Sequence, residues 1–354
     1  MTWLKQKAGN NSQLVQAQTA NFGVSVQDVE YIFLKLFEDK FSSYSTEAFS
    51  KAKERVEEFT INFLKELNEE SPESIENIKD PGVQSAVLEA ESGFAKTGDE
   101  NLGEILVSML VQRTKQTERN SKQLAYNEAI SVAQKLAPRH LDALTLLFFL
   151  RNVGFNQWDV DPNYLYQRID AFTNPIISNL PVTKSDVQYL VATSCATTST
   201  LDEVTWPYAM KKRYPGVFTK GVSLDSHPEL EKYMETGRSG LLIIPYNDQQ
   251  IPDHGKFQVN AVNEEMLTKK RETYGLSDAE FSELHAAMQV SPMDDDEVVA
   301  LLKQRIPSAA LVHEFWSETG LSHCQPTIIG TAIAHSNYRR ILPAFDASID
   351  VWIN

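Results

Sequence analysis

Apolar residues recur at three- and four-residue intervals through much of the first 200 residues, which is the spacing of one face of an α-helix. Between residues 26 and 70 this pattern appears twice, and it predicts a helical hairpin over residues 23–70. The polar stretch that follows, residues 68–79, is the best candidate for a linker. The second half of the hairpin carries a continuous apolar stripe opposite a face of lysine and glutamate: Ala48, Ala52, Val56, Phe59, Phe63 and Leu67.

Helix-start and helix-stop signals then indicate a compact helical bundle over residues 80–200. Asp80-Pro81 places an N-cap residue before a proline at the first helical position, and Gly98 marks the end of that helix. Asp99 begins another helix, and two more are expected at residues 121–136 and 138–154. Further starts follow at residues 161–162 and 183–186.

The most apolar run of the chain, residues 141–150, is too short to span a bilayer and predicts a buried helix. Because its helix is apolar around much of its circumference, we expect its side chains at the centre of the bundle. The expected core residues are Leu106, Leu144, Leu147 and Phe148.

The pattern changes after about residue 200, where prolines become frequent. Residues 241–244 are β-prone and residues 256–260 alternate polar and apolar side chains, which together predict a small β-hairpin with a long loop. Helices are expected again at residues 277–288, 295–304 and 326–338, and the tail at 348–353 alternates like a strand. The predicted fold is therefore mainly α: a multi-helix bundle with a small, winged-helix-like hairpin in an α+β module over residues 201–354.

Residues 1–22 form a polar N-terminal segment that we expect to be a strand or disordered. A strand without a partner nearby in sequence leaves backbone donors and acceptors that another chain can supply. With the hairpin that follows it, the segment is therefore a candidate for self-association or docking. The residues proposed to mediate this assembly are Ser12, Leu14, Val15, Gln16 and Gln18.

Composition and charge narrow the class of protein. The apolar and charged fractions, 42% and 23%, are those of a globular protein. A formal net charge of −15 disfavours broad binding to nucleic acid or to an anionic membrane. Cys195 and Cys324 are too few for a disulfide framework, which favours a reducing compartment. Because the N-terminus lacks the apolar run of a signal peptide, we expect a cytoplasmic protein with no membrane partner.

Searches for catalytic motifs yield only near matches. The stretch 216–221 has the glycine spacing of a phosphate-binding loop, but Val222 stands where a lysine must be. Residues 237–240 are one residue short of a nucleophile elbow, and His313-Glu314 is followed by Ser317 where a zinc-protease helix needs a second histidine. The sequence therefore predicts no catalytic residue, no cofactor and no metal site.

Two other groups of residues have both a chemical and a structural interpretation. His323, Cys324 and His335 are metal-ligating types that lie close in sequence, but no further ligand pair accompanies them. The acids at residues 294–297 stand where a helix is expected to begin, and a helix N-terminus favours negative charge. The structural interpretation is preferred in both cases.

Two basic runs next to tyrosines have the composition of a nucleic-acid site. Both also fall near expected helix C-termini, where cations are favoured in any case. The candidate nucleic-acid patch consists of Lys211, Lys212, Arg213, Arg339 and Arg340.

The chain opens with G-x-N-S at 9–12 and Gln-Ala-Gln at 16–18, and three further stretches are distinctive: residues 52–59, residues 88–138, and residues 327–334 with 351–353. Through these four stretches the chain resembles a family of uncharacterised bacterial proteins of about 350 residues that are carried patchily among accessory genes. The last two of these stretches are also distantly similar to the abortive-infection alpha proteins of phage defence, although residues 325–327 depart from the usual leucine-threonine turn. The resemblance implies a bacterial cytoplasmic setting and a role in phage defence, and no mechanism.

Three functions compete. We favour a non-catalytic interaction or assembly protein, a sensor or regulator in phage defence, whose partner is another protein or a second copy of the chain. The second is a hydrolase or nuclease around Asp253, His254 and Glu264, although the strand after Asp253 lacks the acid and lysine of a magnesium site. The third is a winged-helix regulator that binds nucleic acid.

Overall fold

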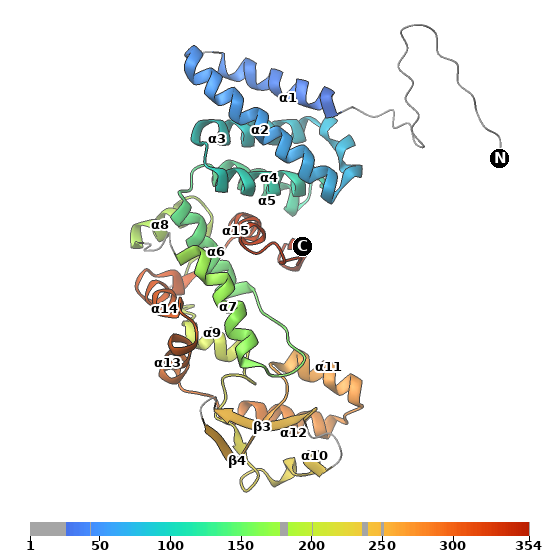
Figure 1. Cartoon of the computed structure of the whole chain (residues 1–354), viewed down its shortest axis with the longest axis vertical. Helices are drawn as coiled ribbons and strands as arrows, with labels where there is room; N and C mark the ends of the chain where they lie inside the picture. Colours follow the sequence, from blue (N-terminus) through green and yellow to red (C-terminus); the bar gives the residue numbers. More distant parts are fainter. Residues whose placement is uncertain are drawn as a thin grey trace, which may run out of the picture.

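The computed structural model describes residues 26–42, 44–177, 183–199, 201–235, 240–248 and 251–353, and the fold is mainly α-helical, as predicted (Figure 1). The α-helices are α1 (Val26–Phe41), α2 (Thr46–Glu70), α3 (Pro81–Thr97), α4 (Glu100–Thr114), α5 (Ser121–Ala133), α6 (Pro138–Asn152), α7 (Pro162–Ile177), α8 (Lys184–Ala192), α9 (Trp206–Arg213), α10 (Lys232–Glu235), α11 (Glu264–Tyr274), α12 (Asp278–Gln289), α13 (Asp295–Arg305), α14 (Ala309–Glu318) and α15 (Ile328–Ile341). Short 3-10 helices are η1 (Pro72–Lys79), η2 (Pro228–Leu230), η3 (Leu321–His323) and η4 (Ile349–Val351).

The strands form two small antiparallel sheets. One pairs β1 (Ala196–Thr198) with β5 (Cys324–Pro326), and the other has the order β2-β4-β3, from β2 (Val222–Ser223), β3 (Ile243–Asp248) and β4 (Ile251–Val259). The predicted hairpin is therefore confirmed as β3 and β4, but its long loop is not, because the two strands continue toward each other as far as Asp248 and Ile251.

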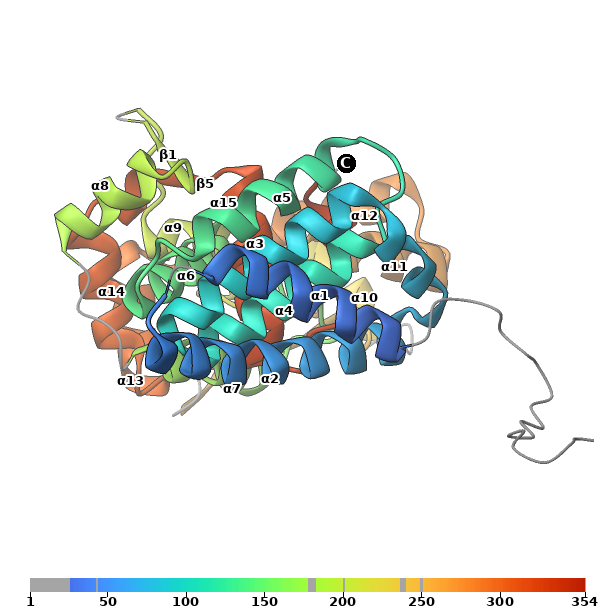
Figure 2. The ribbon, with the colours of Figure 1, turned by 90° about the horizontal axis from the view of Figure 1, so that it is seen from above.

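The helices are arranged in layers from one end of the molecule to the other. The α1–α2 hairpin lies over α3, α4 and α5, and these helices run side by side when seen from above (Figure 2). The last long helix, α15, packs against α4, α5 and α6, so the end of the chain returns to the first bundle. The three-stranded sheet lies at the opposite end with α10, α11 and α12 (Figure 1).

Capping side chains fix where many of these helices begin. The Asp80 carboxylate accepts hydrogen bonds from the backbone N–H groups of Gly82 and Val83, and Gly98 ends the same helix with φ 62°. Asp99 caps α4 by accepting from Leu102 N–H. These caps confirm the helix starts read from the sequence.

The expected core residues are buried. Leu106, Leu144, Leu147 and Phe148 have no exposed surface. They belong to one hydrophobic cluster that extends from Val29 to Ile353. The core is therefore continuous across residue 200, because α15 completes the bundle that α4, α5 and α6 begin.

Two local predictions are wrong. The expected linker at residues 68–79 is helical: α2 continues to Glu70, and η1 follows with Ile78 buried against the main core. The expected C-terminal strand is the 3-10 turn η4, where Ser348 caps the backbone N–H of Asp350. In both stretches the buried residues are four apart, Ser74 and Ile78 in the first and Ile349 and Ile353 in the second, which is a helical spacing.

No bounds for α9, α11 and α14 followed from the sequence, although a helix C-terminus was expected near the basic run at 211–213. The reason is clearest in α9, because Pro207 is one of the prolines that become frequent after residue 200. A proline in the first turn of a helix loses no hydrogen bond, and Thr205 caps this helix by accepting from Tyr208 N–H.

Candidate functional site: an acidic groove between α2 and α4

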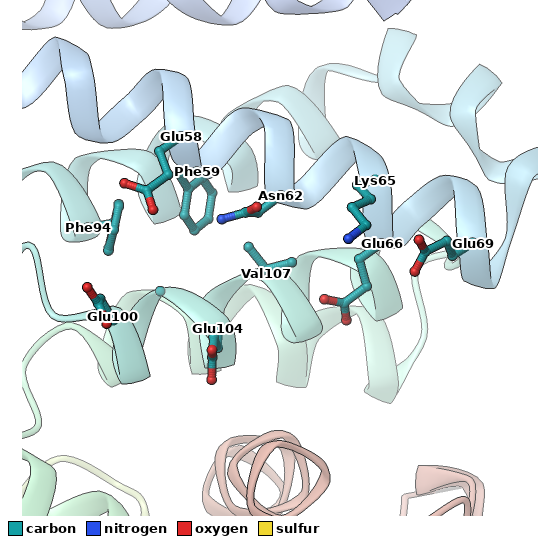
Figure 3. Close-up of a pocket in the computed structure, with 11 residues that line it drawn as sticks. Glu58, Phe59, Asn62, Lys65, Glu66, Glu69, Phe94, Glu100, Glu104 and Val107 are labelled. Carbon is teal, nitrogen blue, oxygen red and sulfur yellow. The ribbon is translucent and has the colours of Figure 1, made fainter. Parts of the chain in front are cut away.

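A groove of about 430 Å³ lies between α2 and α4 at the end of the molecule that holds the α1–α2 hairpin (Figure 3). Side chains from α2 extend toward α4 along its length, and those of α3 and α4 complete its walls. It is lined by Glu58, Phe59, Asn62, Lys65, Glu66, Glu69, Phe94, Glu100, Gly103, Glu104 and Val107.

Helical spacing explains why these side chains share one groove. The α2 positions 58, 62, 65, 66 and 69 are three or four residues apart and so occupy one face of that helix. Positions 100, 103, 104 and 107 do the same on α4. Gly103 is required where α4 meets α3, since a Cβ atom there would lie 2.8 Å from the Phe94 ring.

The groove has an apolar floor and an acidic rim. Phe59, Phe94 and Val107 are buried, whereas the five carboxylates around them are exposed or half-buried. Lys65 is the one cation among the lining residues. Such a floor accommodates the aliphatic stem of a lysine or arginine while the rim pairs with its charged end.

The Glu66 carboxyl is the group most affected by this environment. Burial raises its pKa, the neighbouring Glu70 carboxylate raises it further, and Arg339 opposes both, so that the pKa lies at about 7. The groove therefore gains negative charge near neutral pH, and a bound cation would favour the ionised form of Glu66.

Glu70, one turn further along α2, is already compensated. Its carboxylate accepts hydrogen bonds from Arg339 of α15, from Lys115 Nζ at 2.8 Å and from Gln112 Nε2 at 3.0 Å. Burial raises the pKa of Glu70, but these cations outweigh burial and hold it below its ordinary value. Glu70 therefore links α2 to α4 and α15. The negative charge that is not compensated in this way is that of the carboxylates that line the groove.

The side chains that line the groove indicate what it can do chemically. Carboxylates accept hydrogen bonds and attract cations, and the lining residues include no cysteine, serine or histidine to act as a nucleophile or general base. Over the described part of the chain, no three His, Cys, Asp or Glu side chains converge closely enough to hold a metal ion. The arrangement suits the binding of a positively charged segment.

The residues proposed for assembly, Ser12 to Gln18, lie outside the described residues. The side chains of Asp253 and His254 are also outside the description, although their backbone belongs to β4 and not to a loop. Glu264, the third residue of the proposed hydrolase site, begins α11, is exposed and lies 3.4 Å from His285 Nε2.

The basic residues proposed as a nucleic-acid patch come from two helices, and each has a contact within the chain. On α9, Lys211 pairs with Asp295, Lys212 lies 5.8 Å from the Tyr208 ring, and the Arg213 guanidinium donates to Leu150 O at 3.0 Å. Burial lowers the pKa of Arg213.

On α15 the two remaining cations are also engaged. Arg339 binds Glu70, and Arg340 donates to Asn337 Oδ1 and to Asn101 Oδ1 at 3.0 and 2.8 Å. Most of the lysines and arginines in the two basic runs are therefore engaged in contacts that join helices.

The other candidate groups have structural partners. Asp294 and Glu297 form the capping box of α13, and both pair with Lys220. Cys324 begins β5, where burial raises the pKa of its thiol. The His335 Nε2 atom lies 2.9 Å from Ala347 O on another part of the fold.

The structure also contains a histidine–aspartate pair that sequence reasoning missed. His140 Nε2 lies 2.9 Å from Asp186 Oδ1, and Arg139 Nε donates to the same oxygen at 2.7 Å. The other ring nitrogen of His140 accepts the backbone N–H of Ala137, so the ring caps α6. The pair joins the starts of α6 and α8 and leaves no ring nitrogen free for proton transfer. No motif signals it, since 46 residues separate the two partners.

Comparison with known proteins places the chain in a family. A protein-family model matches residues 23–353, which is nearly the whole chain. The chain belongs to this family. The description of the family states no activity. No curated protein and no solved structure matches the chain. None of the described helices of this family member combines the length and the apolar character needed to cross a membrane.

Proposed function

We propose that this protein is a non-catalytic interaction and assembly protein, and that its α2–α4 groove binds a basic segment of a partner protein. The single observation that carries this proposal is the combination of an apolar floor with a rim of five carboxylates. Lysine and arginine side chains have the matching form, an aliphatic stem with a cationic end.

The charge of the whole chain supports a basic partner. A net charge of −15 attracts a cationic segment at long range, and the groove then provides local contacts that fix its position. Nucleic acid is disfavoured by the same charge, and the basic residues at 211–213 and 339–340 are engaged within the chain.

The biological setting of this function is also part of the proposal. The resemblance to accessory-genome proteins and to abortive-infection proteins supports a sensor or regulator in bacterial phage defence, acting in the cytoplasm. In that setting, binding of a basic partner segment would signal that a phage has infected the cell, or would bring together the proteins that respond to the infection.

The proposal is tested by measuring the binding of a fluorescein-labelled, lysine- and arginine-rich dodecapeptide by fluorescence anisotropy. The groove variant Glu69→Lys/Glu104→Lys is expected to weaken binding by roughly tenfold or more, because two exposed rim carboxylates become cations. The matched control Glu314→Lys/Glu318→Lys changes the net charge equally on the exposed face of α14.

The comparison between the two variants distinguishes binding at the groove from general electrostatic attraction to the negatively charged chain. If both variants weaken binding to the same extent, the peptide responds only to net charge and the groove is not the binding site. Binding that is unaffected by Glu69→Lys/Glu104→Lys would overturn the proposal in the same way.

A further inference from the structure

The residues that precede α1 have the charge that the groove lacks. Residues 1–27 contain two lysines, Lys5 and Lys7, and no aspartate or glutamate, in a chain whose net charge is −15. Trp3 and Leu4 stand immediately before them and offer large apolar side chains. The segment therefore matches both parts of the groove, its acidic rim and its apolar floor.

The segment enters the described structure at α1, which packs against α2. Near the start of α1, Glu30 shares a small cavity with Glu57, Thr60 and Ile61 of α2. Those positions alternate along α2 with Glu58 and Asn62, which line the groove. The chain thus arrives at the helix that carries most of the groove residues.

The length of the segment is sufficient to reach the groove. Eighteen residues lie between Lys7 and Val26, where α1 begins, and at full extension they span roughly 60 Å. A tether of this length keeps its end at an effective concentration on the order of millimolar near its own groove. A second copy of the chain at micromolar concentration competes poorly with that.

We propose that residues 1–22 dock in the α2–α4 groove of their own chain, with Lys5 and Lys7 among the rim carboxylates and Trp3 against the floor. This inference rests on the proposed function, because it names the segment that occupies the groove when no partner is bound. A partner must then displace the segment, so the N-terminus sets the threshold for partner binding.

Site-directed photo-crosslinking of the full chain tests this docking. A photo-crosslinking phenylalanine derivative replaces Trp3, and crosslinked peptides are identified by mass spectrometry in the monomer band. Crosslinks to residues 58–69 of α2 or 100–107 of α4 are expected. They should be lost in Glu69→Lys/Glu104→Lys and retained in Glu314→Lys/Glu318→Lys. Crosslinks to other surfaces, or crosslinks to the groove only in a dimer band, overturn docking within one chain.

A second measurement distinguishes failure of this inference from failure of the proposed function. In full-length Lys5→Glu/Lys7→Glu, the labelled dodecapeptide should bind about tenfold more tightly than to the unaltered chain, as expected if the segment occupies nine tenths of the grooves. Equal affinities overturn the inference while leaving the groove a peptide site. No binding by either protein overturns the proposed function, and the inference with it.

Discussion

The carboxyl group of Glu91 on α3 lies 3.0 Å from the hydroxyl oxygen of Thr60 on α2, and both residues are buried. The Thr60 hydroxyl has one proton, and it is 2.8 Å from Val56 O, which can only accept. If the hydroxyl donates to Val56 O, the carboxyl must supply the proton that joins Glu91 to Thr60. Burial raises the pKa of Glu91 to about 8, in agreement with a protonated carboxyl at neutral pH.

We therefore expect Glu91→Gln to stabilise the protein at pH 8. The folded state keeps the Glu91 proton up to about pH 8, whereas the unfolded chain releases it near 4.5. The free energy of unfolding consequently falls as pH rises between these values, by roughly 1 to 3 kcal/mol. An amide in place of the carboxyl removes that dependence and still donates to Thr60.

Urea unfolding at pH 5 and pH 8 checks this expectation, with the exposed Glu314→Gln as the control. The Glu91→Gln variant should lose less stability than the parent between the two pH values. An equal loss in both proteins would show that Glu91 is ionised in the folded state.

The pH dependence of peptide binding should follow Glu66. Below pH 7 its carboxyl is largely neutral, and above pH 7 it adds a negative charge to the groove. Affinity for a peptide of lysine and arginine, whose charges do not change in this range, should rise from pH 6 to pH 8 by roughly three- to tenfold. Anisotropy titrations of Glu66→Gln should show a flat profile. A profile that keeps its slope in this variant would assign the titration to another group.

Leu147→Ala tests the centre of the core. Leu147 on α6 has no exposed surface and lies in the cluster that joins the two halves of the chain. Removing its buried side-chain atoms leaves a cavity, and we expect a loss of about 2 to 5 kcal/mol in the free energy of unfolding. Chemical denaturation measures this directly, with the exposed Leu201→Ala as the control. A loss under about 0.5 kcal/mol would mean that α6 is peripheral.

Asp186→Asn should destabilise the junction between α6 and α8. The carboxylate accepts hydrogen bonds from Arg139, His140 and the backbone and hydroxyl of Thr183. An amide nitrogen at one of these positions cannot accept, and the expected cost is about 1 to 3 kcal/mol.

The same aspartate predicts an acid-sensitive contribution to stability. Burial raises the pKa of Asp186, but the hydrogen bonds of Arg139, Thr183 and His140 outweigh burial and hold the pKa below its ordinary value. The folded state therefore gains stability from Asp186 above about pH 4 and loses it as pH falls further. Thermal unfolding between pH 3 and pH 6 should show a steeper acid loss in the parent than in Asp186→Asn. Parallel curves would contradict this assignment.

Helices with strong local signals were predictable from the sequence. The stripe from Ala52 to Leu67 and the Asp80-Pro81 start depend on residues within a few positions of each other, and the structure confirms both. Where the local signal is ambiguous the prediction failed. Pro207 lies in the first turn of α9, in a region where frequent prolines concealed the start of that helix, and residues 349–351 form a 3-10 turn where a strand was expected.

The candidate site was not predictable in the same way. Glu66 and Glu104 looked like ordinary solvated acids of two amphipathic helices, because each helix alone has an acidic face. Only the packing of α2 on α4 turns those two faces toward one groove and places Phe59 and Phe94 beneath them. The basic runs illustrate the reverse, since Arg213 and Arg339 were candidates for a nucleic-acid patch and are engaged in contacts between helices.

The sequence by itself determined many of the helices, several of their caps, the hairpin of β3 and β4 and the residues at the centre of the core. These follow from the 3.6- and two-residue periods of apolar side chains and from capping groups, which are local properties of the chain. Tertiary structure alone decided that α15 returns to pack on α4, α5 and α6, that Asp186 reaches His140, and that five carboxylates surround one groove. Contacts between residues tens to hundreds of positions apart depend on how whole helix faces pack against one another. A local sequence pattern shows which face of a helix is apolar, but it does not show which other helix that face will contact.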